Sequence, residues 1–278
     1  MTMNSRRRWL ASTLTSTLTS TLAAGLAPLP AWAQDPRRGT IDPLRVGVDP
    51  ALIASGLAPA WQRAFHADMG VAVRWLAQPA LPLLDALERG ELDVAVSNAP
   101  DADARLDAQG LVHDRRAVAG GGFVLVGPAT RAKRREPMAT DGAAALQRVH
   151  AACVAGEAVF ISANDGSGTH AAEQALWRRA GLAPAAPWYL KLPADRSVLA
   201  EARASAGHAL VERAVWLAQG GSPLAVIVDA DPALAEQIHA MRSFRVNHPA
   251  AKLFVAWLAG PQGRRVVAAQ RGYQVPAA

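Results

Sequence analysis

The sequence contains a single cysteine, Cys153, among 278 residues, so it can form no internal disulfide. Its histidines and this cysteine lack the spacing of a zinc site, and no two histidines stand four residues apart around an acidic residue. The apolar stretch near the N-terminus is short and rich in Thr and Ser, below the roughly 20 residues of a membrane span. We therefore expect no metal, no cofactor and no membrane anchor.

The sequence also lacks a concentrated basic region. Its formal net charge is +6, but the basic residues are scattered and the only dense run is Arg131 to Arg135. Nucleic-acid binding normally requires basic residues clustered on one face, so we expect no nucleic-acid partner.

Residues 1–33 have the features of a secretory signal peptide. Arg6, Arg7 and Arg8 precede a modestly apolar segment that ends at Ala31-x-Ala33. The segment Ser5–Leu10, which contains these arginines, also resembles a twin-arginine signal. We therefore expect export to the periplasm, with cleavage after Ala33. Removing three arginines and no acidic residue lowers the formal charge from +6 to +3.

The remaining chain begins with an alternation of strands and helices. Residues 44–48, 71–76 and 92–96 read as strands, separated by helices at 52–66 and 81–89. This order predicts right-handed crossovers and an α/β fold with mixed, mostly parallel sheets. The length allows one large core or two lobes, of which we favour two. Ligands in such folds bind beyond the carboxyl ends of the strands.

Further elements are predicted from periodicity and turn residues. The last helix should pack Leu253, Phe254, Trp257 and Leu258 against the core. The other expected strands are 120–128, 158–161, 188–190 and 224–228, and the other expected helices are 143–155, 168–179, 198–206, 210–219 and 250–270.

The stretch Phe160–Glu173 is the strongest candidate for a ligand loop. It is an apolar strand followed by two glycines, Gly166 and Gly168, and by a helix start with hydroxyls at Ser167 and Thr169. Glycines permit close backbone approach, and the free N–H groups of a helix start favour an anion. The same residues also make an ordinary helix cap, which on local chemistry is the favoured interpretation.

The chain from Leu44 to about Gly272 resembles the tungstate-binding periplasmic proteins of ABC importers, which are two-lobed solute-binding proteins. The most specific shared segments are Leu84–Pro100, Gly122–Pro128, Phe160–Glu173, Trp188-Tyr189, Leu210–Leu217 and Trp257–Gly263.

This resemblance implies a periplasmic binding protein fold with the ligand cleft between two lobes. Residues 34–126 and 242–278 would form lobe 1, and residues 127–241 would form lobe 2. It also implies a monomer without catalytic residues, an oxyanion or other small polar ligand, and a membrane ABC permease as partner. The expected ligand-binding residues are Asp49, Ser97, Ser162, Ser167, Gly168, Thr169 and Arg213.

The departures from the family pattern fall in the pocket. Val48-Asp49-Pro50-Ala51 replaces a hydroxyl-rich run, and Ala163 replaces an arginine. The loops Gln78–Pro82 and Leu192–Arg196 also differ. A carboxylate about 4 Å from a dianion is repulsive by roughly 8 kcal/mol at an effective dielectric constant near 20. A tungstate-type ligand and a different polar or zwitterionic ligand therefore both remain open.

Two other classes of function are weighed against solute binding. A serine hydrolase using Ser167, His170 and Asp165 is disfavoured because the nucleophile elbow Gly-x-Ser-x-Gly is missing and His170 is poorly placed as a base. A sensory relative that presents its surface to a partner protein is compatible with the lost hydroxyls.

Overall fold

The computed structural model describes residues 42–129, 139–193, 195–220 and 223–277. The predicted signal peptide and the run Arg131–Arg135 lie outside these residues. Residues 41–278 form one unit by their internal contacts. In the part of the chain that is described, no helix has the length and apolar character needed to cross a membrane.

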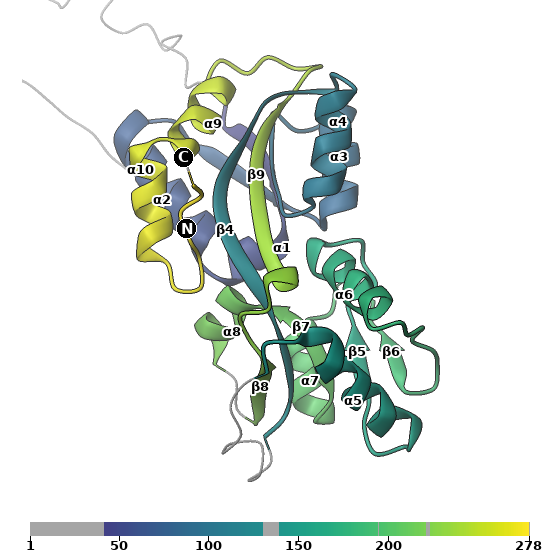
Figure 1. The fold of residues 1–278 in the computed structure, drawn as a ribbon. Coiled ribbons are helices and arrows are strands. Elements are labelled where there is room, and N and C mark those ends of the chain that lie inside the picture. Colours follow the sequence, from purple (N-terminus) through teal and green to yellow (C-terminus); the bar gives the residue numbers. More distant parts are fainter. Residues whose placement is uncertain (1–41, 130–138, 194, 221–222, 278) are drawn as a thin grey trace, which may run out of the picture. The chain divides into compact units, whose positions relative to one another are not determined.

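The elements alternate along most of the chain (Figure 1). The strands are β1 (Leu44–Val48), β2 (Val73–Ala77), β3 (Val94–Ser97), β4 (Val112–Pro128), β5 (Phe160–Ser162), β6 (Tyr189–Lys191), β7 (His208–Glu212), β8 (Leu224–Val228) and β9 (Ala235–Ser243). The helices are α1 (Pro50–Ala54), α2 (Leu57–Met69), α3 (Ala80–Glu88), α4 (Pro100–Ala108), α5 (Gly142–Val154), α6 (Gly168–Arg179), α7 (Val198–Ser205), α8 (Arg213–Gln219), α9 (Ala251–Ala259) and α10 (Pro261–Ala269), with a 3₁₀ turn at Pro232–Leu234.

The strands pair in the order β2-β1-β3-β9-β4-β7-β5-β6, and β8 pairs with β4. The pairs β1–β2, β1–β3, β5–β6 and β5–β7 are parallel, whereas every pair that involves β4 or β9 is antiparallel. The α/β class with parallel sheet regions is confirmed. The antiparallel pairs are confined to the two strands that join these regions.

β4 changes partners along its length. Val112 to Gly122 pair with β9, and Phe123 onwards pair with β7 and β8. We call the elements on the β1–β2–β3–β9 side the first half and those on the β5–β6–β7–β8 side the second half. The chain therefore crosses into the second half at Gly122 and returns between Val228 and Ala235. The lobe boundaries at 126 and 241 stay predictions.

Each half has an apolar core of its own. In the first half, Phe65 lies edge-on against Phe254 with ring centroids 4.8 Å apart. In the second half, Phe160 and Trp177 make a similar contact at 5.1 Å. These separate cores position the strand ends of both halves around the site described below.

Several predicted elements differ from the structure. Leu210–Glu212 was predicted as helix but belongs to β7, because a short, fully buried apolar run has no periodicity that separates helix from strand. Gly56, in the left-handed conformation, divides the first predicted helix into α1 and α2. Leu253 is 44% exposed rather than packed in the core. α4, β9 and the first half of β4 were not predicted.

Candidate functional site

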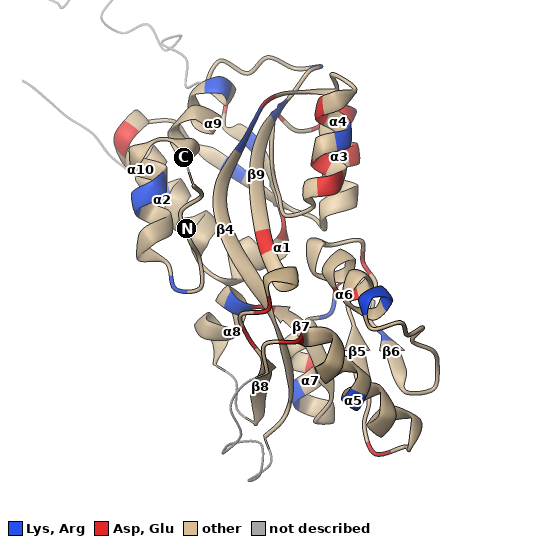
Figure 2. Ribbon diagram, viewed as in Figure 1, with Lys and Arg blue, Asp and Glu red and all other residues tan. Residues whose placement is uncertain are grey.

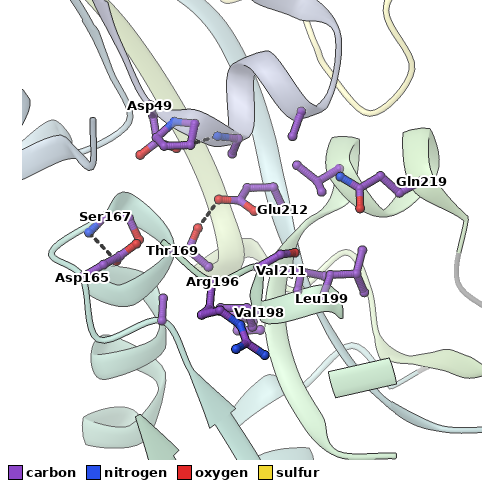
Figure 3. A pocket seen from close by; sticks show the side chains of 17 residues that line it. Asp49, Asp165, Ser167, Thr169, Arg196, Val198, Leu199, Val211, Glu212 and Gln219 are labelled. Atoms are coloured by element: carbon purple, nitrogen blue, oxygen red, sulfur yellow. Dashed lines mark hydrogen bonds between the residues drawn. The ribbon is translucent and has the colours of Figure 1, made fainter. Parts of the chain in front are cut away.

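A cavity of about 190 Å³ lies where loops and helices of both halves meet (Figure 3). α1 and its cap contribute from the first half, and the β5–α6 loop, α7, β7 and α8 contribute from the second. The lining residues are Asp49, Pro50, Ala51, Ala54, Ala163, Asp165, Ser167, Thr169, Arg196, Ser197, Val198, Leu199, Leu210, Val211, Glu212, Val215 and Gln219. The cavity therefore lies beyond the ends of β1, β5 and β7.

Asp49 is the N-cap of α1 and is 2% exposed. Its Oδ1 accepts a hydrogen bond of 2.9 Å from the Ala51 backbone N–H, and its Oδ2 has no hydrogen-bond partner among the described residues. Burial raises the pKa of this carboxyl to about 8, with further contributions from the charges of Glu212 and Asp165. Asp49 thus lines the cavity with a buried carboxyl whose second oxygen has no partner among the described residues.

Glu212 ends β7 and lies in the same cavity as Asp49. It is 8% exposed, and its Oε1 accepts a hydrogen bond from the Thr169 hydroxyl, drawn as a dashed line in Figure 3. Burial raises the pKa of Glu212, and the charge of Asp165 raises it further. Thr169 therefore reaches the cavity, as predicted from the sequence, but its hydroxyl proton is already used by Glu212.

A third buried carboxyl, Glu236 at the start of β9, extends this acidic group. Its Oε1 accepts from the Asn98 amide at 2.9 Å, and burial followed by the charge of Glu212 raises its pKa to about 8. Within the described residues, no three His, Cys, Asp or Glu side chains are placed to hold a metal ion. Three buried carboxyls with raised pKa values thus lie in or near the cavity.

Ser167 is the N-cap of α6, where its Oγ accepts from the His170 backbone N–H at 3.2 Å. The cap interpretation is therefore confirmed. The same side chain also lines the cavity, so the cap and the predicted ligand loop are one structure.

Gly168 allows the start of α6 to approach the β3–α4 loop. A Cβ atom at Gly168 would lie 2.3 Å from Asn98 Oδ1 and 2.6 Å from the Asn98 backbone oxygen. A side chain at this position would push the two halves of the chain apart here. Gly168 therefore acts through packing in this structure.

Ser97 and Ser162 are fully buried at the ends of β3 and β5 and do not line this cavity. Ser97 Oγ accepts from the Ala99 N–H at 3.1 Å. Ser162 Oγ lies 2.9 Å from the Tyr189 hydroxyl, which also donates to Glu173 at 2.6 Å. Both serines thus stabilise the loops that carry the site.

Arg213 starts α8 and is absent from the described lining of the cavity. Its guanidinium forms an ion pair with Asp229. The structure thus brings together Asp49, Ser167 and Thr169 from the predicted set, with Gly168 beside them, but not Ser97, Ser162 or Arg213.

Glu212 and Glu236 were not predicted as site residues. Glu212 could have been found from the sequence, because it is the first charged residue after the apolar run Ala209–Val211 and so stands where a buried strand ends. Glu236 could not, since β9 itself was not predicted.

The geometry of Ser167 and His170 differs from that of a hydrolase. The imidazole Nδ1 faces the Gly166 N–H at 3.4 Å, and the bond between Ser167 and His170 involves the backbone N–H of His170 instead of its ring. Nucleophilic activation of a serine requires a base in contact with its hydroxyl.

A second cavity of about 560 Å³ lies between α4 and α6 and shares Ser167 with the first. It is larger, and both cavities have exposed residues in their walls, such as Asp101 and Arg178 in this one and Arg196 in the first. We favour the smaller cavity as the site because three of the predicted ligand-binding residues, Asp49, Ser167 and Thr169, line it.

The chain matches the PBP superfamily domain over residues 33–237. It is 26% identical over 221 residues to the tungstate-binding protein TupA of Peptoclostridium acidaminophilum, covering 77% of this chain and 76% of that protein. The tungstate ABC transporter structure from Geobacter sulfurreducens aligns with a TM-score of 0.67 at 24% identity, covering 83% and 99% of the two chains. The tungstate-binding protein of Desulfovibrio alaskensis aligns with a TM-score of 0.66 at 24% identity, covering 84% and 99%.

The chain therefore belongs to the PBP superfamily, whose match covers more than half of its residues. The structural likenesses confirm the predicted periplasmic binding protein fold. Within this superfamily, its similarity is to tungstate-binding proteins of ABC transporters.

Proposed function

We propose that this chain is the solute-binding protein of an ABC-type importer. It captures a small polar solute without converting it and delivers the solute to a membrane permease. Membership of the PBP superfamily and the names of its relatives support this class of function. The residues proposed to contact the solute are Asp49, Ser167 and Thr169.

The observation that carries the proposal is a small cavity lined by residues from both halves of the chain. Solute-binding proteins hold their ligands between two halves that close on them. The proposal includes export to the periplasm by the signal at residues 1–33, with the twin-arginine route as one of the open routes, and a monomeric state. Size-exclusion chromatography with light scattering tests the last point.

The test is direct. The purified protein is titrated by calorimetry with tungstate, molybdate, sulfate and small carboxylates, because the relatives' names put oxyanions first. In parallel, native mass spectrometry identifies any solute that remains bound during purification. A chain that retains no solute and binds none in any chemical class is not a solute-binding protein.

A sensory role is the second candidate. The observation that favours it is the replacement of the hydroxyl-rich segment by Val48–Ala51, which places Asp49 in the cavity. Genes for a permease and an ATPase beside this gene favour import, whereas their absence favours the sensory role.

A further inference from the structure

We propose that the cavity selects a small organic cation, an ammonium or guanidinium group on a short aliphatic body, instead of an oxyanion. This inference rests on the proposed solute-binding function and names the chemical class of its ligand.

The first observation is the unpartnered oxygen of Asp49. The side chain is almost completely buried and lines the cavity, and its Oδ2 has no hydrogen-bond partner among the described residues. A buried polar atom in a native structure normally has a partner, so a ligand that donates a hydrogen bond here completes the site. A cation does so best, because charge-assisted hydrogen bonds are the stronger kind.

The second observation is the sign of the surrounding charge. Asp165 and Glu212 lie in the same cavity as Asp49, and Glu236 lies close enough for its pKa to respond to both Asp49 and Glu212. Of the described lining residues, Arg196 is the only Lys or Arg. Its guanidinium pairs with Glu201 at 2.8 Å and its side chain is 60% exposed. An oxyanion would therefore meet carboxyl groups without a buried positive charge.

Figure 2 shows that Lys and Arg are spread over many elements of both halves and do not gather at one place. The acidic character of the cavity is thus a local feature, although the whole sequence has a positive formal charge.

The third observation is the apolar part of the cavity wall. Pro50, Ala51 and Ala54 of α1 line one part of the cavity, and Val198, Leu199 and Val215 line another. These side chains offer no hydrogen bonds and favour contact with alkyl groups. A volume of about 190 Å³ suits a body of a few carbon atoms. The combination of acidic and apolar surfaces matches an aliphatic amine or guanidine.

Four probes of similar shape separate the charge classes. n-Butylammonium and n-butylguanidinium are the cations, 1-butanol is neutral and butanoate is the anion. Each is titrated into the protein at pH 8 by calorimetry, with tungstate as a fifth probe. Because burial raises the pKa of Asp49 and of Glu212, these two carboxyl groups are more fully ionised at this pH than at neutral pH. We expect binding of the two cations and at least tenfold weaker binding of the other three.

Asp49→Asn is the informative variant, because Asn is as good an N-cap as Asp and keeps the amide oxygen that caps α1. We expect it to weaken binding of the cations at least tenfold. Asp141→Asn is the matched control, since Asp141 caps α5 in the same way but is exposed and lies outside the cavity. We expect the control to bind as the wild type does. Circular dichroism verifies that both variants fold.

The outcomes separate this inference from the proposed function. Binding of butanoate or tungstate but not of the cations overturns the inference and leaves solute binding intact. Equal binding of cations by wild type and Asp49→Asn also overturns it, because the charge of Asp49 would then be irrelevant. If no probe binds and no solute is retained during purification, both the inference and the proposed function are wrong.

Discussion

At the scale of single residues, the distinctive feature is a carboxylate held in an unfavourable environment. Asp49 caps a helix through one oxygen, while the other is buried without a partner among the described residues. The neighbouring carboxyls of Glu212 and Asp165 increase the cost of ionisation. Such an arrangement lowers the stability of the ligand-free protein, which is typical of binding sites.

The stability of the ligand-free protein should therefore depend on pH through Asp49. Its pKa is raised from 3.8 in the unfolded chain to about 8 in the folded protein. Between these values the folded state binds more protons than the unfolded state, so the free energy of unfolding falls as pH rises from about 4 to about 8. The charged groups around Asp49 are Glu212, Asp165 and Glu236. The raised pKa values of Glu212 and Glu236 add to this trend.

Asp49→Asn removes the ionisation of this group while keeping the helix cap. We expect the variant to gain more than about 1 kcal/mol relative to wild type between pH 5 and pH 8, since one pKa unit corresponds to about 1.4 kcal/mol. Urea denaturation at the two pH values measures this difference. Asp141→Asn, with an exposed carboxylate, should show the smaller change. A constant difference between Asp49→Asn and wild type would contradict the raised pKa.

At the scale of elements, the start of α6 has two roles that sequence analysis treated as alternatives. Ser167 caps the helix and lines the cavity, and Gly168 lets the helix pack closely against the loop that follows β3. The free N–H groups of a helix start attract anions, whereas the carboxyls around this one repel them. The start of α6 by itself therefore favours an anion, whereas the carboxyls around it favour a cation.

Ser167→Ala separates the two roles. Loss of an N-cap costs about 1 kcal/mol, so we expect Ser167→Ala and the control Asp141→Ala to lower the free energy of unfolding by similar amounts. Only Ser167→Ala should also weaken solute binding, which calorimetry measures with whichever solute is bound. Unchanged binding in Ser167→Ala would leave Ser167 with the capping role alone.

At the scale of the whole described unit, the two halves are joined through β4 and β9 (Figure 1), and both contribute residues to the lining of the site. The Leu81 N–H donates a hydrogen bond of 3.2 Å to the Gly166 carbonyl, which connects α3 with the β5–α6 loop. Leu81 and Gly166 line the second cavity, beside Ser167, which both cavities share. In binding proteins of two halves, the halves move relative to each other when the protein opens and closes. The hydrogen bond between Leu81 and Gly166 is therefore a suitable position at which to restrict movement of the two halves.

A disulfide between positions 81 and 166 should lock the halves. A Cβ atom at Gly166 would lie 3.5 Å from Leu81 Cβ, within the roughly 3.5–4.5 Å range of disulfides. In the variant Leu81→Cys/Gly166→Cys/Cys153→Ala, we expect oxidation to slow solute exchange at least tenfold and reduction to restore it. Stopped-flow measurement of solute binding and release follows this effect.

The single variants Leu81→Cys and Gly166→Cys are the controls for the lock. Gly166 has a φ of 76°, so its replacement introduces strain that the single variant also contains. Equal exchange rates in the oxidised and reduced forms of the triple variant would show that the halves need not separate at this point.

The sequence by itself determined the fold class and most elements of the chain. Strands such as Leu44–Val48 and helices such as Gly142–Val154 have periodicity and caps that depend only on neighbouring residues. The same local logic failed for β7, because a fully buried strand and a buried helix have the same apolar composition. It could not reveal β9, whose residues are specified by pairing with β3 and β4.

Only the tertiary structure decided which side chains form the site. Asp49, Glu212 and Glu236 come from separate elements, and the folding of both halves brings them so close that Glu212 raises the pKa of Asp49 and both raise the pKa of Glu236. In the folded protein Arg213 forms an ion pair with Asp229, and Ser97 and Ser162 are buried in hydrogen bonds with Ala99 and Tyr189. Charge proximity and burial arise from long-range packing, so they have no counterpart in the local sequence.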